Sequence, residues 1–198
     1  SLLLLSCDGD STHNHHNQVT QEFNEGTQSM VSDMEAIYSK LDFEKNNFQN
    51  HEALIIMEKK IDEGDFPNTR KNLMKYANLL LRAGENDKAI DVINGLLMAN
   101  PGMERINDST LKIHQLLAIT YMRKGEIDNC IINHNSESCL FPIKGEAIHT
   151  AQDGSRGAIQ IYEQILEKFP EDYESMWLLN VAYMTLGEYP DLVPSQYL

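Results

Sequence analysis

Apolar residues recur at helical spacing from Leu73 to Pro101, in two runs that a glycine separates. The first run places four residues on one helix face: Leu73, Tyr76, Ala77 and Leu80. Gly84 ends that helix, and the second run has its own face: Ala89, Ile93, Leu96 and Leu97. Pro101 closes the pair, because proline lacks the N–H that would continue a helix. The small side chains of Ala77 and Ala89 allow the two helices to cross closely, so the pattern predicts a helical hairpin.

The same frame returns further along the chain in an interrupted form. A helix is expected from about Asp108 to Lys124, ended by Gly125, with this inner face: Leu111, His114, Leu117, Ala118 and Tyr121. We interpret His114 as a core histidine. The matching second helix appears only later, closed by Pro170, with this inner face: Ala158, Tyr162, Ile165 and Leu166. About 28 residues beyond a standard unit therefore separate the two helices. A third unit resumes at Met176, Leu179, Asn180 and Tyr183, followed by Gly187.

A helical hairpin that repeats about every 34 residues resembles the tetratricopeptide repeat. The pattern therefore predicts an all-α fold without a sheet, built as a tetratricopeptide-like array of hairpins wound into a right-handed solenoid. One irregular insertion is expected at about residues 126–154. Repeat arrays of this kind bind partners and rarely catalyse, so the architecture predicts little about chemistry.

Two further helices are expected before this array, in the same domain of residues 29–198. The first has helical spacing at Met30, Met34, Ile37, Tyr38 and Leu41, with Thr27 or Ser29 as its N-cap. The second covers Asn47 to Glu63, ends at Gly64, and turns these residues inward: Phe48, Ala53, Leu54, Ile56, Met57 and Ile61. The pair departs from the repeat frame, as terminal repeats commonly do.

The chain begins with an apolar segment that ends in a cysteine. Leu4-Leu5-Ser6-Cys7 resembles a bacterial lipobox, in which Cys7 receives lipid, and a chance hydrophobic N-terminus is the alternative. We expect residues 1–6 to be a signal-peptide remnant and 7–28 a flexible polar tether. The histidines at 13, 15 and 16 fall in that tether, where a spacer is favoured over a metal site. Lipidation predicts an extracytoplasmic, membrane-anchored location, periplasmic or at the cell surface.

The net charge of the chain argues against two classes of partner. The chain has 30 acidic and 16 basic residues, a formal net charge of −14. Nucleic acids and anionic membrane surfaces are recognised by clustered Lys and Arg. We therefore expect no nucleic-acid partner, and we expect membrane attachment only through lipid on Cys7.

The insertion carries the candidate chemistry, because a regular array needs only packing. In an exported chain Cys130 and Cys139 most simply form a disulfide, with free thiols as an alternative. A metal site is the other alternative, and its candidate ligands are Cys130, His134, Cys139 and His149. Their spacing matches no standard zinc motif. His134 and Glu137 are candidates for contact with a partner. No nucleophile or cofactor loop stands beside them, so we expect no catalytic residue and no cofactor.

Several segments together resemble one bacterial family. They are residues 129–143 with their two cysteines, His149, Gly154-Ser155-Arg156, residues 177–190 and residues 193–198. The whole is similar to the tetratricopeptide leader of cartilage-acidic-protein-type (ASPIC/UnbV) lipoproteins. In that family the leader precedes an FG-GAP/VCBS β-propeller, so the resemblance implies that this chain is a fragment. It implies no catalytic residue here.

Three functions remain open from the sequence. The first is an exported, lipid-anchored module that binds a protein, either its own downstream propeller or another exported protein. The second is a metal-binding or redox-active periplasmic protein that uses residues 130–149. The third is a structural leader that separates a propeller from the membrane.

Overall fold

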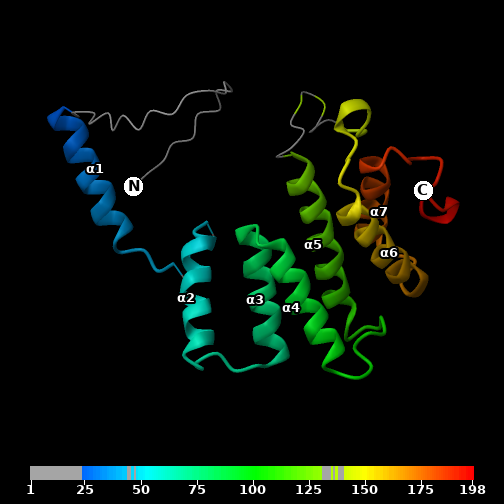
Figure 1. The fold of residues 1–198 in the computed structure, drawn as a ribbon, viewed down its shortest axis with the longest axis horizontal. Helices are drawn as coiled ribbons and strands as arrows, with labels where there is room; N and C mark the ends of the chain where they lie inside the picture. The colour runs from blue at the N-terminus through cyan, green and yellow to red at the C-terminus, as the bar shows by residue number, and fades with distance from the viewer. Residues whose placement is uncertain (1–23, 44–45, 47, 131–134, 136, 138–140) are drawn as a thin grey trace. The chain divides into compact units, whose positions relative to one another are not determined.

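The computed structural model describes residues 24–43, 46, 48–130, 135, 137 and 141–198, although not the side chain of Cys130. Within these residues every regular element is a helix and there is no strand, so the prediction of an all-α chain is confirmed (Figure 1). The chain divides into two compact units, 1–41 and 42–198.

The first unit contains one described helix, α1 (Glu25–Tyr38). Its N-cap is Asn24, whose side chain accepts a hydrogen bond of 2.8 Å from the backbone N–H of Thr27. The helix therefore begins before Thr27 and Ser29, the expected caps. Residues 25–28, which were expected to belong to the tether, are helical. None of its residues is buried, and Ile37 is 65% exposed. The predicted helix is therefore present, and it has no buried face.

The second unit begins with α2 (Asn50–Asp62), α3 (Arg70–Ala83) and α4 (Asn86–Met98). Only three of the residues expected to face inward from α2 are buried: Ala53, Leu54 and Met57. Phe48 precedes the helix and is 91% exposed, and Ile61 is also exposed, so both predictions were wrong. The hairpin of α3 and α4 is confirmed. Gly84 ends α3 with a φ of +84°, a conformation that glycine adopts without strain.

The next helix, α5 (Leu111–Cys130), continues through Gly125, which was wrongly expected to end it. Gly125 instead lies where α5 meets α6 (Asp153–Lys168). A Cβ on Gly154 of α6 would lie 2.4 Å from the backbone nitrogen of Gly125. The two glycines therefore permit backbone contact between the helices, and α5 and α6 pair across the insertion as the repeat frame predicted. Because α5 ends at Cys130 and α6 begins at Asp153, the insertion covers residues 131–152 and is shorter than the expected 126–154.

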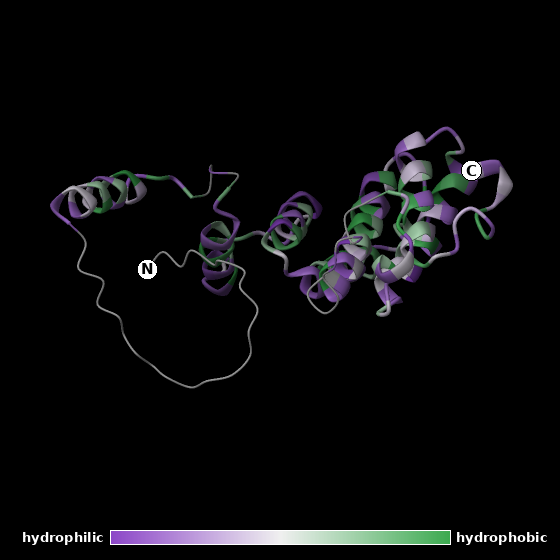
Figure 2. Cartoon of the chain, turned by 90° about the horizontal axis from the view of Figure 1, so that it is seen from above, coloured by the Kyte–Doolittle hydropathy of each residue, from purple (hydrophilic) through white to green (hydrophobic). Residues whose placement is uncertain are grey.

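The array ends with α7 (Tyr173–Thr185) and a short 3₁₀ turn, η2 (Ser195–Tyr197). Each helix from α2 to α7 contacts the next one in sequence, and α3 also contacts α5. One apolar cluster joins α3, α4 and α5, and another joins α5, α6 and α7. Figure 2 shows the hydrophobic residues gathered between these helices. His114 is buried, with Nδ1 3.0 Å from the carbonyl oxygen of Thr110, which confirms its interpretation as a satisfied core histidine.

Candidate functional site

A groove of about 350 Å³ lies among four helices of the second unit. Met74 and Asn78 of α3 line one side, and Glu174 and Leu178 of α7 also line it. Between them α5 contributes Lys112, Gln115, Leu116 and Ile119. Because α3, α5 and α7 alternate along the chain, the groove follows from the order of the helices in the array.

Hydrogen bonds fix several polar side chains around the groove. Gln115 Nε2 lies 2.5 Å from Asp172 Oδ2, which joins α5 to the start of α7. The same carboxylate caps α7, because Oδ1 accepts a hydrogen bond of 3.3 Å from the backbone N–H of Ser175. Asn78 donates to the carbonyl oxygen of Met74 at 2.9 Å. The groove thus presents oriented amide groups beside apolar surface, a lining typical of binding sites.

Tyr162 of α6 also lines the groove, and its hydroxyl is unusual. The residue is 1% exposed, yet its oxygen has no hydrogen-bond partner among the described residues. Burial raises the pKa of Tyr162, and the nearby carboxylates of Glu174 and Asp172 raise it further. The hydroxyl therefore keeps its proton at neutral pH. The sequence pattern identified Tyr162 only as a core residue.

A second polar site lies where the insertion returns to the array. Asn129, near the end of α5, donates to the carbonyl oxygens of Gly125 at 2.7 Å and Ala151 at 2.9 Å. Its own amide oxygen accepts from the backbone N–H of Ala151 at 3.0 Å. We call these contacts the Asn129 latch. They attach the end of the insertion to α5 independently of any disulfide.

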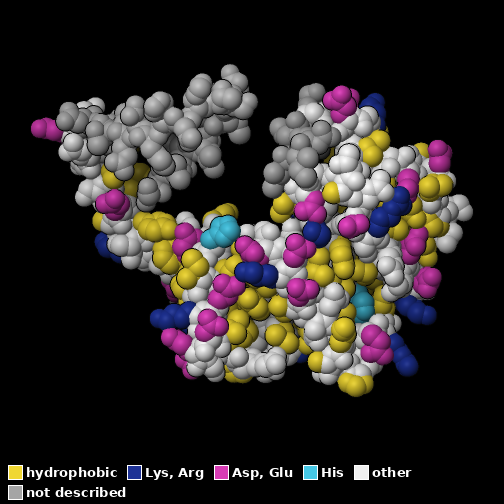
Figure 3. All heavy atoms as spheres, in the orientation of Figure 1, with side chains coloured by type: hydrophobic (Ala, Val, Ile, Leu, Met, Phe, Trp, Pro, Cys, Tyr) yellow, Lys and Arg dark blue, Asp and Glu magenta, His cyan; other side chains and the backbone are white. Residues whose placement is uncertain are grey.

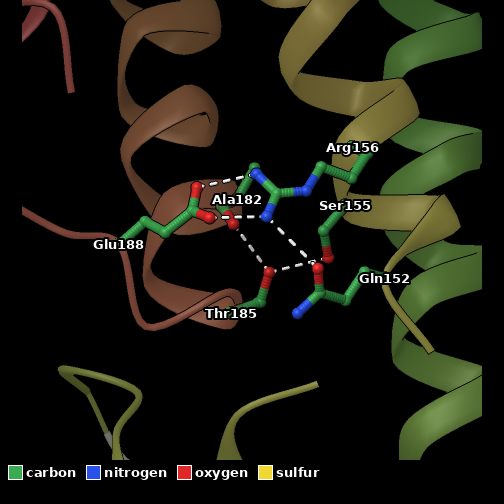
Figure 4. Close-up of polar contacts among 6 residues, drawn as sticks. All are labelled: Gln152, Ser155, Arg156, Ala182, Thr185 and Glu188. Carbon is green, nitrogen blue, oxygen red and sulfur yellow. Dashed lines mark hydrogen bonds and ion pairs between the residues drawn. The ribbon is translucent and has the colours of Figure 1, made fainter. Parts of the chain in front are cut away.

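His149 connects the same end of the insertion to α6 and α7. Its backbone N–H donates to the carbonyl oxygen of Thr185 at 2.8 Å, and its Nδ1 lies 3.1 Å from Ser155 Oγ. Ser155 Oγ is also 2.7 Å from Thr185 Oγ1 (Figure 4). Nearby, Arg156 forms a two-pronged ion pair with Glu188, at 2.8 Å and 2.5 Å. Side chains from three segments thus meet in one hydrogen-bonded network.

The pairing of a serine with a histidine resembles the arrangement that activates a nucleophile. Here, however, Ser155 is 1% exposed and His149 is also buried. A substrate carbonyl cannot approach a hydroxyl covered in this way. The network therefore joins the insertion to α6 and α7, and its role is structural.

The buried imidazole of His149 makes stability depend on pH. Burial lowers its pKa, and only the charge of Glu126 opposes this effect. Below about pH 6.5 the unfolded chain binds a proton that the folded chain resists, so the free energy of unfolding should fall as pH decreases. We expect His149→Gln to remove up to about 1.4 kcal/mol per pH unit from that slope. Urea titrations of both proteins between pH 7 and 5 measure this difference, and parallel curves would contradict it.

The structure places only some of the predicted site residues. Cys7, His134 and Cys139 lie outside the described residues, as does the side chain of Cys130. The disulfide, the lipid attachment and three of the four candidate metal ligands thus stay predictions. Within the described part of the chain, no group of three or more His, Cys, Asp or Glu residues could hold a metal ion. Glu137 Oε2 accepts from the backbone N–H of Glu146 at 3.1 Å, so its carboxylate stabilises the insertion itself.

Sequence reasoning missed Asn129, Ser155 and Thr185 as a group. Asn129 and Ser155 stood within the motifs that carried the family resemblance, but nothing indicated what they contact. Their partners are 22 and 30 positions away along the chain, and a periodic pattern contains no information about such pairs.

Comparisons of this chain with protein-family models, curated proteins and solved structures gave no match. The helices of the described residues include none that is both long and apolar enough to cross a membrane. The structure of the described residues defines an all-α protein whose packed helices leave a groove among α3, α5, α6 and α7.

Proposed function

We propose that this chain is a tetratricopeptide-like, right-handed solenoid that serves as a non-catalytic protein-interaction module. It belongs to an exported, lipid-anchored bacterial protein and precedes a β-propeller. The observation that carries the proposal is the groove, because the first helices of successive hairpins, α3, α5 and α7, line it together. In a solenoid of hairpins these helices form one continuous inner surface, which is suited to an extended ligand.

The lining of the groove supports binding rather than catalysis. Lys112 and Glu174 place opposite charges beside the apolar side chains of Leu116, Ile119 and Leu178. Acidic and basic side chains are also interspersed on the face drawn in Figure 3. Such a mixture suits a protein segment, which offers backbone amides and side chains of both kinds. The occupant is a segment of the downstream propeller or of another exported protein.

A screen of end-capped synthetic hexapeptides tests the proposal directly. We expect some of them to bind, and Lys112→Glu in the groove to weaken that binding by roughly tenfold. Lys168→Glu is the matched control, because Lys168 is also exposed but lies at the end of α6 and does not line the groove. If no hexapeptide binds more tightly than about 1 mM, or if both variants weaken binding equally, the groove is not the interaction site.

The proposed anchoring depends on Cys7, which lies outside the described residues. Cys7→Ser in the full-length gene should release the protein from the membrane fraction, because the thiol that receives lipid is lost. Fractionation followed by immunoblotting measures this, with Cys139→Ser as the control that leaves Cys7 intact. Unchanged membrane association of the Cys7 variant would refute lipid anchoring.

A further inference from the structure

Two exposed aromatic side chains touch each other beside the groove. The rings of Phe141, in the insertion, and Trp177, on α7, have centroids 6.5 Å apart and an interplanar angle of 35°. Phe141 is 62% exposed and Trp177 is 61% exposed, so less than half of either residue is covered. Trp177 follows Glu174 by one helical turn and directly precedes Leu178, and both of those residues line the groove. The wall that α7 gives to the groove therefore continues onto an aromatic surface.

A purely structural role does not account for the exposure of these rings. A pair that only attached the insertion to α7 would stabilise it most when buried, because the hydrophobic gain is proportional to the area removed from water. Tyr173, one turn before Trp177 on the same helix, is 71% exposed as well. Exposed aromatic side chains that gather in this way mark interaction surfaces, where they act as binding anchors.

The lining of the groove narrows the kind of segment that fits beside these rings. Lys112 and Glu174 carry opposite charges, so the groove selects neither an acidic nor a basic ligand. A bound helix needs apolar anchors along its whole groove, whereas Lys112, Gln115 and Glu174 interrupt the apolar side chains here. The described part of the chain has no strand to whose edge a peptide could add. The recurring mode that uses exposed aromatic side chains is the binding of proline-containing segments in the polyproline II conformation.

We propose that Phe141 and Trp177 together bind a proline of the extended protein segment that occupies the groove. This inference rests on the proposed function, because it specifies the ligand of the same groove. The proline ring is apolar and packs on the aromatic rings, and proline has no backbone N–H that would be left without a partner there. A polyproline II segment is also extended before it binds, so binding costs it little conformational entropy.

The fluorescence of Trp177 reports on this contact, because Trp177 is the only tryptophan of the chain. The probe is a set of capped, uncharged hexapeptides that contain two prolines, matched by a set in which alanine replaces both. Binding of the proline set should shift the emission of Trp177 to shorter wavelength and reduce its quenching by acrylamide, because the proline ring then shields the indole from water. The alanine set should bind roughly tenfold more weakly.

Variants of Phe141 separate the aromatic contact from the attachment of the insertion, and all of them retain Trp177 as the reporter. Phe141→Ala should weaken binding of the proline set by roughly tenfold. Phe141→Leu keeps an apolar side chain against α7 but lacks the aromatic face, so it should also bind more weakly. Phe141→Tyr keeps the aromatic face and should bind as wild type does. Phe48→Ala is the matched control, because Phe48 is 91% exposed but does not line the groove.

The possible failures of this inference and of the proposed function give different results. Equal affinity for the two peptide sets, with binding still sensitive to Lys112→Glu, would overturn the proline assignment while the proposed function survives. Proline peptides that bind without changing the emission of Trp177, or that bind Phe141→Leu as tightly as wild type, would overturn the aromatic contact. Absence of binding by every hexapeptide would contradict the proposed function and this inference with it.

Discussion

Gly154→Ala should destabilise residues 42–198 by about 3 kcal/mol or more, although it adds a single methyl group. The new Cβ would lie 2.4 Å from the nitrogen of Gly125, 2.6 Å from its Cα and 2.7 Å from the carbonyl oxygen of Tyr121. All three are backbone atoms of α5, so no side-chain rotation relieves the overlap. The helices α5 and α6 would have to separate, which opens the apolar cluster around Ala158 and Tyr162.

Gly95→Ala provides the matched control for this prediction. Gly95 is an exposed helical glycine of α4, and a Cβ there would meet nothing within 4 Å. Alanine is a better helix former, so this variant should gain about 0.5–1 kcal/mol. Urea denaturation of both variants measures the contrast. Similar midpoints would mean that α5 and α6 do not approach as closely as the structure shows.

The glycines also show what the sequence could predict about the fold. Gly84 and Gly125 each follow an apolar helical run, and both were expected to end a helix. Gly84 does so because its backbone adopts a positive φ. Gly125 does not, because its function is to allow the backbone of α6 to approach. The local sequence is compatible with both roles, and only the tertiary contact distinguishes them.

The pairing of α5 with α6 was predictable because the apolar frame resumes in register after the insertion. The exposure of α1 was not predictable from its sequence. Its apolar spacing indicates a buried face, but spacing does not say whether a partner covers that face, and in this structure the helix buries no residue. The same limit applies to Tyr162. Its position on the inner face of a helix was correct, but an unpaired hydroxyl depends on the neighbours that α5 and α7 provide.

Substituting Asn129→Asp should cost roughly 2–4 kcal/mol and release the end of the insertion. Aspartate has the shape of asparagine, but it replaces the amide N–H₂ with an oxygen. That oxygen would face the carbonyl oxygens of Gly125 and Ala151, which now accept hydrogen bonds of 2.7 Å and 2.9 Å. Because Asn129 is buried, water cannot screen the repulsion.

Hydrogen exchange locates this effect along the chain. In Asn129→Asp, amides of residues 147–152 should exchange faster, while those of α3 and α4 should change little, because the hairpin of α3 and α4 has its own apolar contacts. Asn94→Asp, a partly exposed site on α4, is the control for the added charge. Repeating the measurement with reductant separates the Asn129 latch from the predicted Cys130–Cys139 bond. If both hold the insertion, reduction should accelerate exchange further in the variant. If the variant exchanges like wild type in both conditions, the Asn129 latch does not attach the insertion to α5.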